Sequence, residues 1–240
     1  MMNKKRIWEL DALRGLCIIG MIIIHGVFDL TELYRLFPWK LSDSFSFIQN
    51  WGGVIFLLIS GICVTLGSRS LRRGLVVFGC GMLITAVTVV IYLLGLADRI
   101  IIIYFGILHC LGICMLLWPL FKKCATWLLG VFGGIFALIG LCLYNVAPVD
   151  FPWLIPLGLL YPEFQSADYF PLLPHLGFFL LGAVLGRTLY AKQESLLPNV
   201  NTNNPVIRFL SGCGRYSLFI YMIHQPIIAA LCGGLAWLLD

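Results

Sequence analysis

An arginine, a histidine and an aspartate recur at helical spacing near the start of the chain: Arg14, His25 and Asp29. Steps of four or eleven residues return to one face of an α-helix, and eleven residues rise roughly 16 Å. An imidazole can deprotonate a hydroxyl or amine, or carry an acyl group itself, and a carboxylate one turn away can orient the ring. The spacing therefore predicts a catalytic His25 oriented by Asp29, with Arg14 farther along the same face.

A structural interpretation of this stripe is equally open from spacing alone. Arg14 could extend to lipid phosphates, and His25 with Asp29 could be a structural pair. All four histidines, however, fall inside apolar runs: His25, His109, His175 and His224. An ionisable residue within a membrane span costs about 2.5–3.5 kcal/mol, so such residues face protein or water and are functional candidates. One structural histidine is ordinary, but four are less expected.

Three arginines follow the second apolar run, Arg69, Arg72 and Arg73. Arg69 and Arg72 are three residues apart, so both side chains can reach one anionic ligand, and the planar guanidinium suits phosphate. The other interpretation is a charge cluster that only orients the chain in a membrane. We predict that these arginines, with Arg14, bind a phosphate-bearing ligand.

Polar residues in the second half of the chain are candidates for an acceptor site or cavity. Asp168 and Tyr169 precede an apolar run that contains His175. His224 and Gln225 stand before Pro226 in the last run. A proline inside a helix frees a carbonyl and favours a local break, which is tolerated at membrane depth beside a cavity.

Composition indicates the elements that must position these side chains. Hydrophobic residues make up 60% of the 240 residues, charged residues 11%, and mean hydropathy is +0.97, whereas soluble domains carry about 25% charge. We expect an all-α polytopic transmembrane bundle forming a single domain over residues 1–240. Seven runs are long enough to span a ~30 Å hydrocarbon core, at about 13–30, 51–67, 74–94, 100–120, 124–145, 170–189 and 216–238. The short, proline-broken stretch 151–161 predicts an interfacial or re-entrant segment.

Basic residues predict the orientation. With the N-terminus in the cytoplasm, 13 of the 16 Lys and Arg residues fall inside, as the positive-inside rule expects: Lys4, Lys5, Arg6, Arg14, Arg69, Arg72, Arg73, Lys122, Lys123, Arg187, Lys192, Arg208 and Arg215. Arg35, Lys40 and Arg99 fall outside. We therefore expect the N-terminus inside and the C-terminus outside, with a retained first helix and a cytoplasmic linker at 193–205. Since this signal accounts for the net charge of +5, no nucleic-acid partner is expected.

Several motifs together resemble the membrane acyltransferase superfamily. They are LDALRG at 10–15 with His25 following, FxxxSG at 56–61, RxxR at 69–72, DYFP at 168–171 and SLFIYMIHQP at 217–226. The first three resemble bacterial acyltransferase type 3 proteins. The whole set most resembles short bacterial members of the heparan-α-glucosaminide N-acetyltransferase catalytic family.

The resemblance implies an enzyme of the cell (plasma) membrane that moves an acyl group, in this family acetyl, from cytoplasmic acyl-CoA to a sugar or similar acceptor outside. It implies a role in activity for Arg14 and His25, and donor-side roles for Arg69 and Arg72. The heparan-acetylating enzymes carry a key histidine in the loop after the first span. Residues 31–50 contain no histidine, so that role cannot be carried over, and only His25 remains as a candidate in the first helix.

Two alternatives belong to other classes. A non-catalytic transporter or lipid-binding scaffold would use the polar residues along a pathway, although no inverted repeat is visible. A haem protein would need histidines at matched depth, for which only His25 and His175 qualify. We expect membrane lipids, acyl-CoA and a cell-envelope glycan as partners, and neither metal nor haem. The sequence leaves open the acceptor, the acyl chain, the oligomeric state, and whether His25 acts as base or nucleophile.

Overall fold

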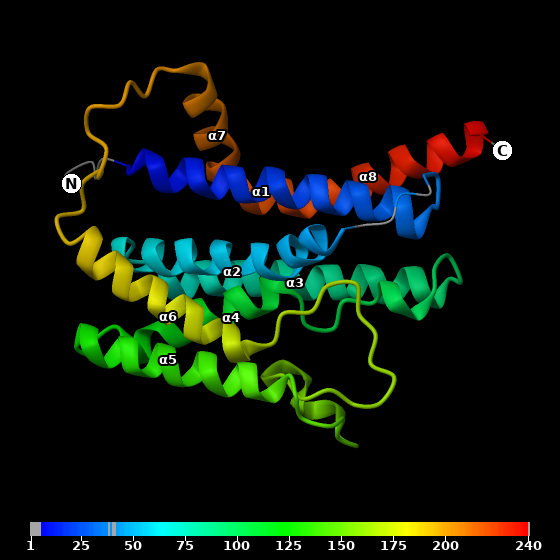
Figure 1. Cartoon of the computed structure of the whole chain (residues 1–240), viewed down its shortest axis with the longest axis horizontal. Helices are drawn as coiled ribbons and strands as arrows, with labels where there is room; N and C mark the ends of the chain where they lie inside the picture. Colours follow the sequence, from blue (N-terminus) through cyan, green and yellow to red (C-terminus); the bar gives the residue numbers. More distant parts are fainter. Residues whose placement is uncertain (1–5, 38, 40–41, 240) are drawn as a thin grey trace. The chain divides into compact units, whose positions relative to one another are not determined.

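The structure is a computed structural model that describes residues 6–37, 39 and 42–239 (Figure 1). Helices make up 72% of the chain, and the extended pairing among these residues is one isolated bridge between Phe105 and Tyr169. The prediction of an all-α chain is confirmed.

The helices are α1 Trp8–Phe28, α2 Asp43–Leu66, α3 Ser70–Leu93, α4 Ile107–Phe121, α5 Thr126–Leu143, α6 Leu172–Leu189, α7 Pro205–Arg215 and α8 Ser217–Leu239. A π-helical turn, Asp29–Leu33, extends α1, and 3₁₀ turns occupy Arg99–Ile101 and Pro152–Leu157.

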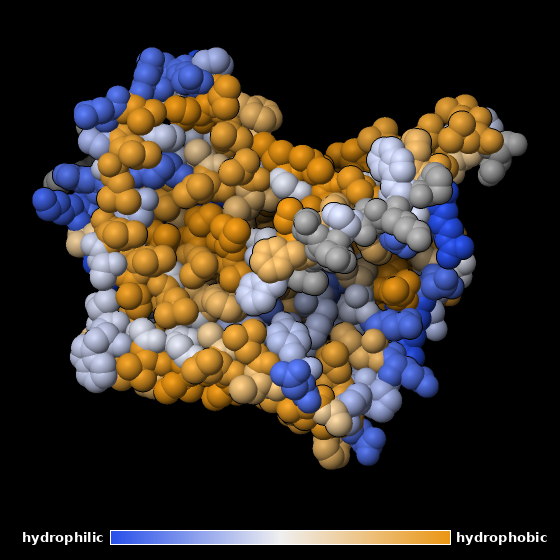
Figure 2. Space-filling model, in the orientation of Figure 1, coloured by the Kyte–Doolittle hydropathy of each residue, from blue (hydrophilic) through white to orange (hydrophobic). Residues whose placement is uncertain are grey.

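Within the described residues, five helical segments are long and apolar enough to cross a membrane: Trp8–Leu33, Ser70–Leu93, Thr126–Leu143, Leu172–Leu189 and Ser217–Leu239. Two shorter apolar helices are Trp51–Leu66 and Ile107–Phe121. Large apolar side chains stay exposed along the helix flanks, among them Leu75, Trp127 and Leu231. Figure 2 shows apolar residues along the helices and hydrophilic ones gathered near helix ends and connections. The chain is therefore built as a membrane protein, while seven spans and the orientation stay predictions; Lys4, Lys5 and Lys40 lie outside the described residues.

The chain forms two compact units, one from residues 1–56 and 193–240, the other from residues 57–192. In the second unit α6 packs along α5 and against α4, while α3 packs along α4. Half of the apolar window of α6 is buried, against 22% for α3 and for α5, so α6 is the core helix of this unit. Gly177 and Gly140 stand where α5 and α6 touch backbone to backbone, as small residues allow in membrane helix pairs.

Helix α4 begins at Ile107, later than the start at residue 100 that hydropathy predicted. The apolar residues before it adopt a 3₁₀ turn and then extended backbone, in which Phe105 pairs with Tyr169. At the start of α4 the Gly106 N–H donates to Nδ1 of His109, and the Ile107 N–H donates to Oδ2 of Asp168. Side-chain acceptors that satisfy the free N–H groups fix the start of a helix, and they are invisible to a hydropathy window.

In the first unit α1 packs along α7 and against α8. The α1–α7 contact depends on two glycines: a Cβ on Gly15 would collide with the carbonyl oxygen of Leu210, and one on Gly214 with that of Asp11. Helix α7 was not predicted, because its residues are too polar for a span. Its first turn is capped by Asn204, whose side-chain oxygen accepts the Val206 N–H at 2.9 Å.

The segment after residue 192 is attached to the start of α1. Glu9 is buried, and its carboxylate accepts the Leu196 N–H at 2.7 Å and the Ser195 hydroxyl at 2.9 Å. Hydrogen bonds to a charged group contribute about 1.5–3 kcal/mol each. The stretch 193–205, expected as a plain linker, is therefore held to α1 at its beginning.

Glu9→Ala should release this segment, because both donors lose their acceptor. We expect cleavage within residues 193–205 by added protease to rise about tenfold or more in detergent-solubilised protein. Glu194→Ala is the matched control, since Glu194 is an exposed acid in the same segment. Equal cleavage of the two variants would contradict the role of Glu9.

Candidate active site

The polar stripe of α1 faces α8, within one compact unit. Arg14 Nη2 donates to the Ser217 hydroxyl at 2.8 Å. His25 Nδ1 lies 2.9 Å from Nε2 of His224 and 3.2 Å from Oε1 of Gln225. Asp29 Oδ2 accepts the side-chain N–H of Gln225 at 2.8 Å. The prediction that Arg14, His25 and Asp29 share one helix face is confirmed, and His224 and Gln225 join the same cluster.

The hydrogen bonds define the proton positions in the neutral rings. His224 Nδ1 lies 2.6 Å from the Tyr221 carbonyl oxygen, which can only accept, so this nitrogen carries the proton. Nε2 of His224 is then an acceptor, and His25 must donate to it from Nδ1. The contacts of Gln225 are consistent with this assignment, because its amide nitrogen donates to Asp29 and its carbonyl oxygen accepts from His25 Nδ1. The lone pair of His25 therefore lies on Nε2.

Nε2 of His25 has no hydrogen-bond partner among the described residues, and the ring is half-buried. A neutral imidazole with one nitrogen fixed as donor and the other free is the arrangement a general base or nucleophile requires. His25 and His224 are 5.0 Å apart between ring centroids and tilted by 42°, so the two rings do not stack face to face.

Asp29 reaches His25 through Gln225 rather than directly, which differs from the expected His25–Asp29 pair. The Asp29 carboxylate accepts a hydrogen bond from Gln225, and the residue is buried, with 3% of its surface exposed. It begins the π-helical turn Asp29–Leu33, and such turns occur often at functional sites. The sequence marked Gln225 as a candidate residue but not as the bridge between Asp29 and His25, because Gln225 lies 196 residues from Asp29.

Arg14 keeps unused hydrogen-bonding capacity. Its Nε is buried without a partner among the described residues, and its guanidinium carbon lies 5.9 Å from the centre of the Phe56 ring. No carboxylate within the described part of the chain forms an ion pair with it. A half-buried guanidinium with an unpartnered Nε and no counterion would be stabilised by an anionic ligand.

Arg69, Arg72 and Arg73 lie in the second unit, at the start of α3. Arg69 is the residue before the helix, Arg72 and Arg73 are in its first turn, and all three are exposed. Positive side chains at the N-terminus of a helix are repelled by the positive end of the helix dipole. A bound anion would offset this repulsion and the repulsion among the arginines themselves. Donor binding by these arginines stays a prediction that this geometry favours.

Asp168, Tyr169 and His175 bond to main chain within the second unit. Asp168 caps α4 as described, the Tyr169 hydroxyl donates to the Ile155 carbonyl at 2.8 Å, and His175 Nδ1 donates to the Pro171 carbonyl at 2.6 Å. Burial raises the pKa of the Tyr169 phenol, which stays a neutral donor. These contacts hold the segment before α6, and a role in acceptor binding stays a prediction.

His109 is satisfied on both sides of its ring. Nδ1 accepts the Gly106 N–H, so Nε2 carries the proton and donates to Thr85 Oγ1 at 3.2 Å; that hydroxyl donates in turn to the Ile103 carbonyl. A buried ring with both nitrogens bonded within its own unit is a packing residue. Within the described ranges, no group of three or more His, Cys, Asp or Glu side chains could hold a metal ion.

Comparison with known proteins identifies the family. Residues 6–226 match the family described as heparan-alpha-glucosaminide N-acetyltransferase, catalytic. The chain belongs to this family. No curated protein and no solved structure matches the chain. Membership in the heparan-alpha-glucosaminide N-acetyltransferase catalytic family agrees with the apolar helices and indicates a membrane acetyltransferase, with acetyl-CoA as the family's acyl donor.

Proposed function

We propose that this protein transfers an acetyl group from cytoplasmic acetyl-CoA to a hydroxyl or amine of a sugar-like acceptor on the outer side of the plasma membrane. The observation that carries the proposal is the cluster around His25, in which α8 fixes one ring nitrogen as a donor and leaves Nε2 free. Family membership supplies the reaction class.

His25 acts as the general base in this proposal. As the acceptor oxygen or nitrogen attacks the thioester carbonyl, Nε2 of His25 takes its proton; the C–S bond then breaks and the acetyl group stays on the acceptor. The imidazolium then gives this proton from Nε2 to the departing CoA thiolate, so that free CoA and neutral His25 result. The imidazolium that forms keeps its Nδ1–H bonds to His224 and Gln225, and Asp29 favours the positive charge through the Gln225 amide.

Arginines bind the phosphates of the donor. The donor-binding role of Arg14 is supported by its buried, unpartnered Nε and by the absence of an ion pair among the described residues. The donor-binding role of Arg69, Arg72 and Arg73 is supported by their exposure at the start of α3. The proposed topology is seven spans with the N-terminus inside, which follows from the distribution of basic residues and assigns all four arginines to the donor side. Asp168, Tyr169 and His175 are proposed for the acceptor side.

Arg14→Gln should weaken acetyl-CoA binding about tenfold or more, since a charge-assisted phosphate contact is worth about 1.5–3 kcal/mol. Calorimetric titration of the purified protein in detergent measures this, and the Arg69→Gln/Arg72→Gln pair should show a loss of similar size. Arg35→Gln is the control, because Arg35 is an exposed arginine outside the proposed site.

A folded wild-type protein that binds no acetyl-CoA at millimolar concentration would overturn the enzyme proposal. It would favour a non-catalytic transporter or lipid-binding scaffold. Binding unaffected by the arginine substitutions would overturn the donor assignment while leaving the reaction class in place.

A further inference from the structure

A pocket of about 370 Å³ lies in the first unit, between the start of α1 and the polar face of α7. This volume is within the range of small-ligand sites. Its lining is polar and basic: Arg6, Trp8, Thr202, Asn203, Ile207, Arg208, Ser211 and Arg215. Of these, Arg6, Arg208 and Arg215 were used above only to predict the orientation in the membrane. None of the active-site residues and none of the proposed donor-binding arginines lines the pocket.

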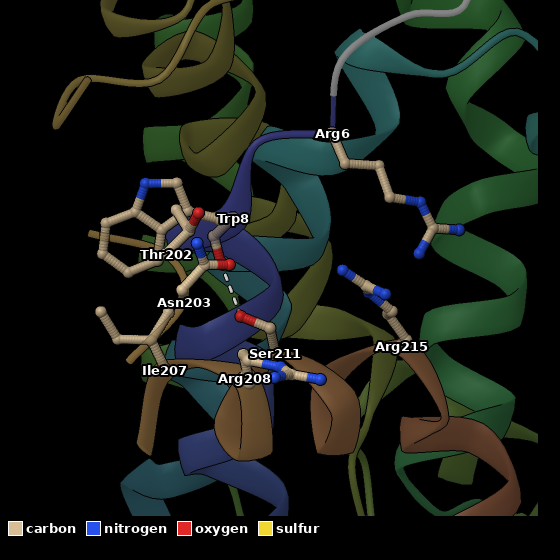
Figure 3. A pocket seen from close by; sticks show the side chains of 8 residues that line it. All are labelled: Arg6, Trp8, Thr202, Asn203, Ile207, Arg208, Ser211 and Arg215. Carbon is tan, nitrogen blue, oxygen red and sulfur yellow. Dashed lines mark hydrogen bonds between the residues drawn. The ribbon is translucent and has the colours of Figure 1, made fainter. Parts of the chain in front are cut away.

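Two arginine side chains converge at one side of the pocket. Figure 3 shows the guanidinium groups of Arg6 and Arg215 turned toward each other, with Trp8, Thr202 and Asn203 on the other side. Like charges in this arrangement repel, so the free protein carries an electrostatic cost that a bound anion would remove. Arg208 adds a third positive charge to the lining.

Asp11 neutralises only part of this charge. Its Oδ2 lies 3.9 Å from Nη1 of Arg6 and 3.7 Å from Nε of Arg215. Both distances exceed hydrogen-bond length, so these are weak, solvent-screened pairs. Three arginines against one carboxylate leave a net charge of +2 at the pocket, without an ion pair for Arg208 among the described residues.

Helix α7 brings the donors together on one side. Arg208, Ser211 and Arg215 are three and four residues apart, so they form one stripe along the helix. The Ser211 hydroxyl is buried and bonded only weakly, at 3.5 Å, to the Trp8 carbonyl (Figure 3). Thr202 and Asn203 add exposed polar side chains just before the helix. Guanidinium groups with neighbouring hydroxyl and amide donors are the chemistry that recognises phosphate.

We propose that this pocket is a binding site for a phosphate-bearing anion, separate from the acetyl-transfer site. Arg6, Arg208 and Arg215 bind the phosphate, and Asp11 orients Arg6 and Arg215 in the free protein. Two sources present this chemistry: a soluble ligand with a phosphate or diphosphate, and the headgroup of an anionic phospholipid. Val206 and Phe209 on α7 are exposed apolar side chains that can contact a lipid surface, and they favour a test of the phospholipid headgroup as the source.

The test uses inorganic pyrophosphate as the probe and the full-length protein in neutral-lipid nanodiscs. We expect saturable binding by calorimetry that weakens about tenfold or more in Arg208→Gln/Arg215→Gln and falls with salt. The matched control is Arg35→Gln, which removes an exposed arginine of the same unit outside the pocket. Thermal unfolding without pyrophosphate checks that the variants fold, and Arg208→Glu alone should abolish binding.

A further arm identifies the source. Pyrophosphate binding that persists in nanodiscs that contain phosphatidylglycerol points to a soluble ligand, and loss of pyrophosphate binding in those nanodiscs points to the lipid. Pyrophosphate that fails to bind wild type, or that binds the double variant equally well, would overturn the proposal. Either result leaves acetyl transfer unaffected, because acetyl-CoA binding through Arg14 is measured separately.

Discussion

Replacing His25 with alanine should lower kcat for acetyl transfer by about 10²–10⁴-fold, the range that a positioned general acid–base group contributes. The substitution removes the only nitrogen of the cluster that has a free lone pair. Transfer of radiolabelled acetyl groups from acetyl-CoA to amino-sugar acceptors in proteoliposomes measures the rate. Membrane abundance and acetyl-CoA binding should stay at wild-type levels, because His25 is not among the donor-binding arginines.

His25→Asn separates chemistry from structure. An asparagine amide can still donate toward His224 and Gln225 in place of Nδ1–H, but it offers no base. It should therefore be as inactive as His25→Ala while restoring any stability that alanine loses. Transfer retained in His25→Asn would remove His25 from the mechanism, and a stable radiolabelled protein formed without acceptor would change its role from base to nucleophile.

Gln225 should act as a positioning residue in the same assay. Gln225→Ala removes the link between Asp29 and His25, and the loss of such a bond costs about 1–3 kcal/mol, or roughly 5–150-fold in kcat. KM for acetyl-CoA should not change. A variant that loses abundance instead of kcat would indicate a purely structural amide.

Periodicity was sufficient to predict which residues of α1 work together. Arg14, His25 and Asp29 lie one, three or four turns apart, and the helix returns them to one face, so their common contact with α8 follows from spacing. The partners on α8 carried a weaker signal. His224 and Gln225 stood out as polar residues in an apolar run, but which of them meets His25 depends on tertiary packing.

Boundaries and polar helices were harder to predict. The start of α4 depends on Asp168, which lies 61 residues from the N–H it caps, so a window of local hydropathy extends the helix too far. Helix α7 is amphipathic and short, so hydropathy does not distinguish it from a loop. Its packing depends on the glycine contact with α1, which is a tertiary feature. The pocket beside it was missed for the same reason.

Gly15→Ala should destabilise the protein, because the new Cβ would collide with the Leu210 backbone oxygen in α7. Overpacking costs about 1–3 kcal/mol, and here the obstacle is backbone rather than a flexible side chain. We expect a lower thermal midpoint in detergent and reduced abundance. Gly20→Ala is the matched control in the same helix: its Cβ meets nothing within 4 Å, so helix propensity alone should make it neutral or slightly stabilising.

The reciprocal glycine provides the decisive comparison. Gly214→Ala places a Cβ against the Asp11 carbonyl, at the same α1–α7 contact seen from the other helix. If α7 must move away from α1 to relieve either collision, one movement relieves both, and the double variant should lose less than the sum of the single losses. Pyrophosphate binding should fall in Gly15→Ala and not in Gly20→Ala, because the pocket is lined from both helices. Additive losses would mean that the two glycines serve independent contacts and that α7 is not one rigid side of the pocket.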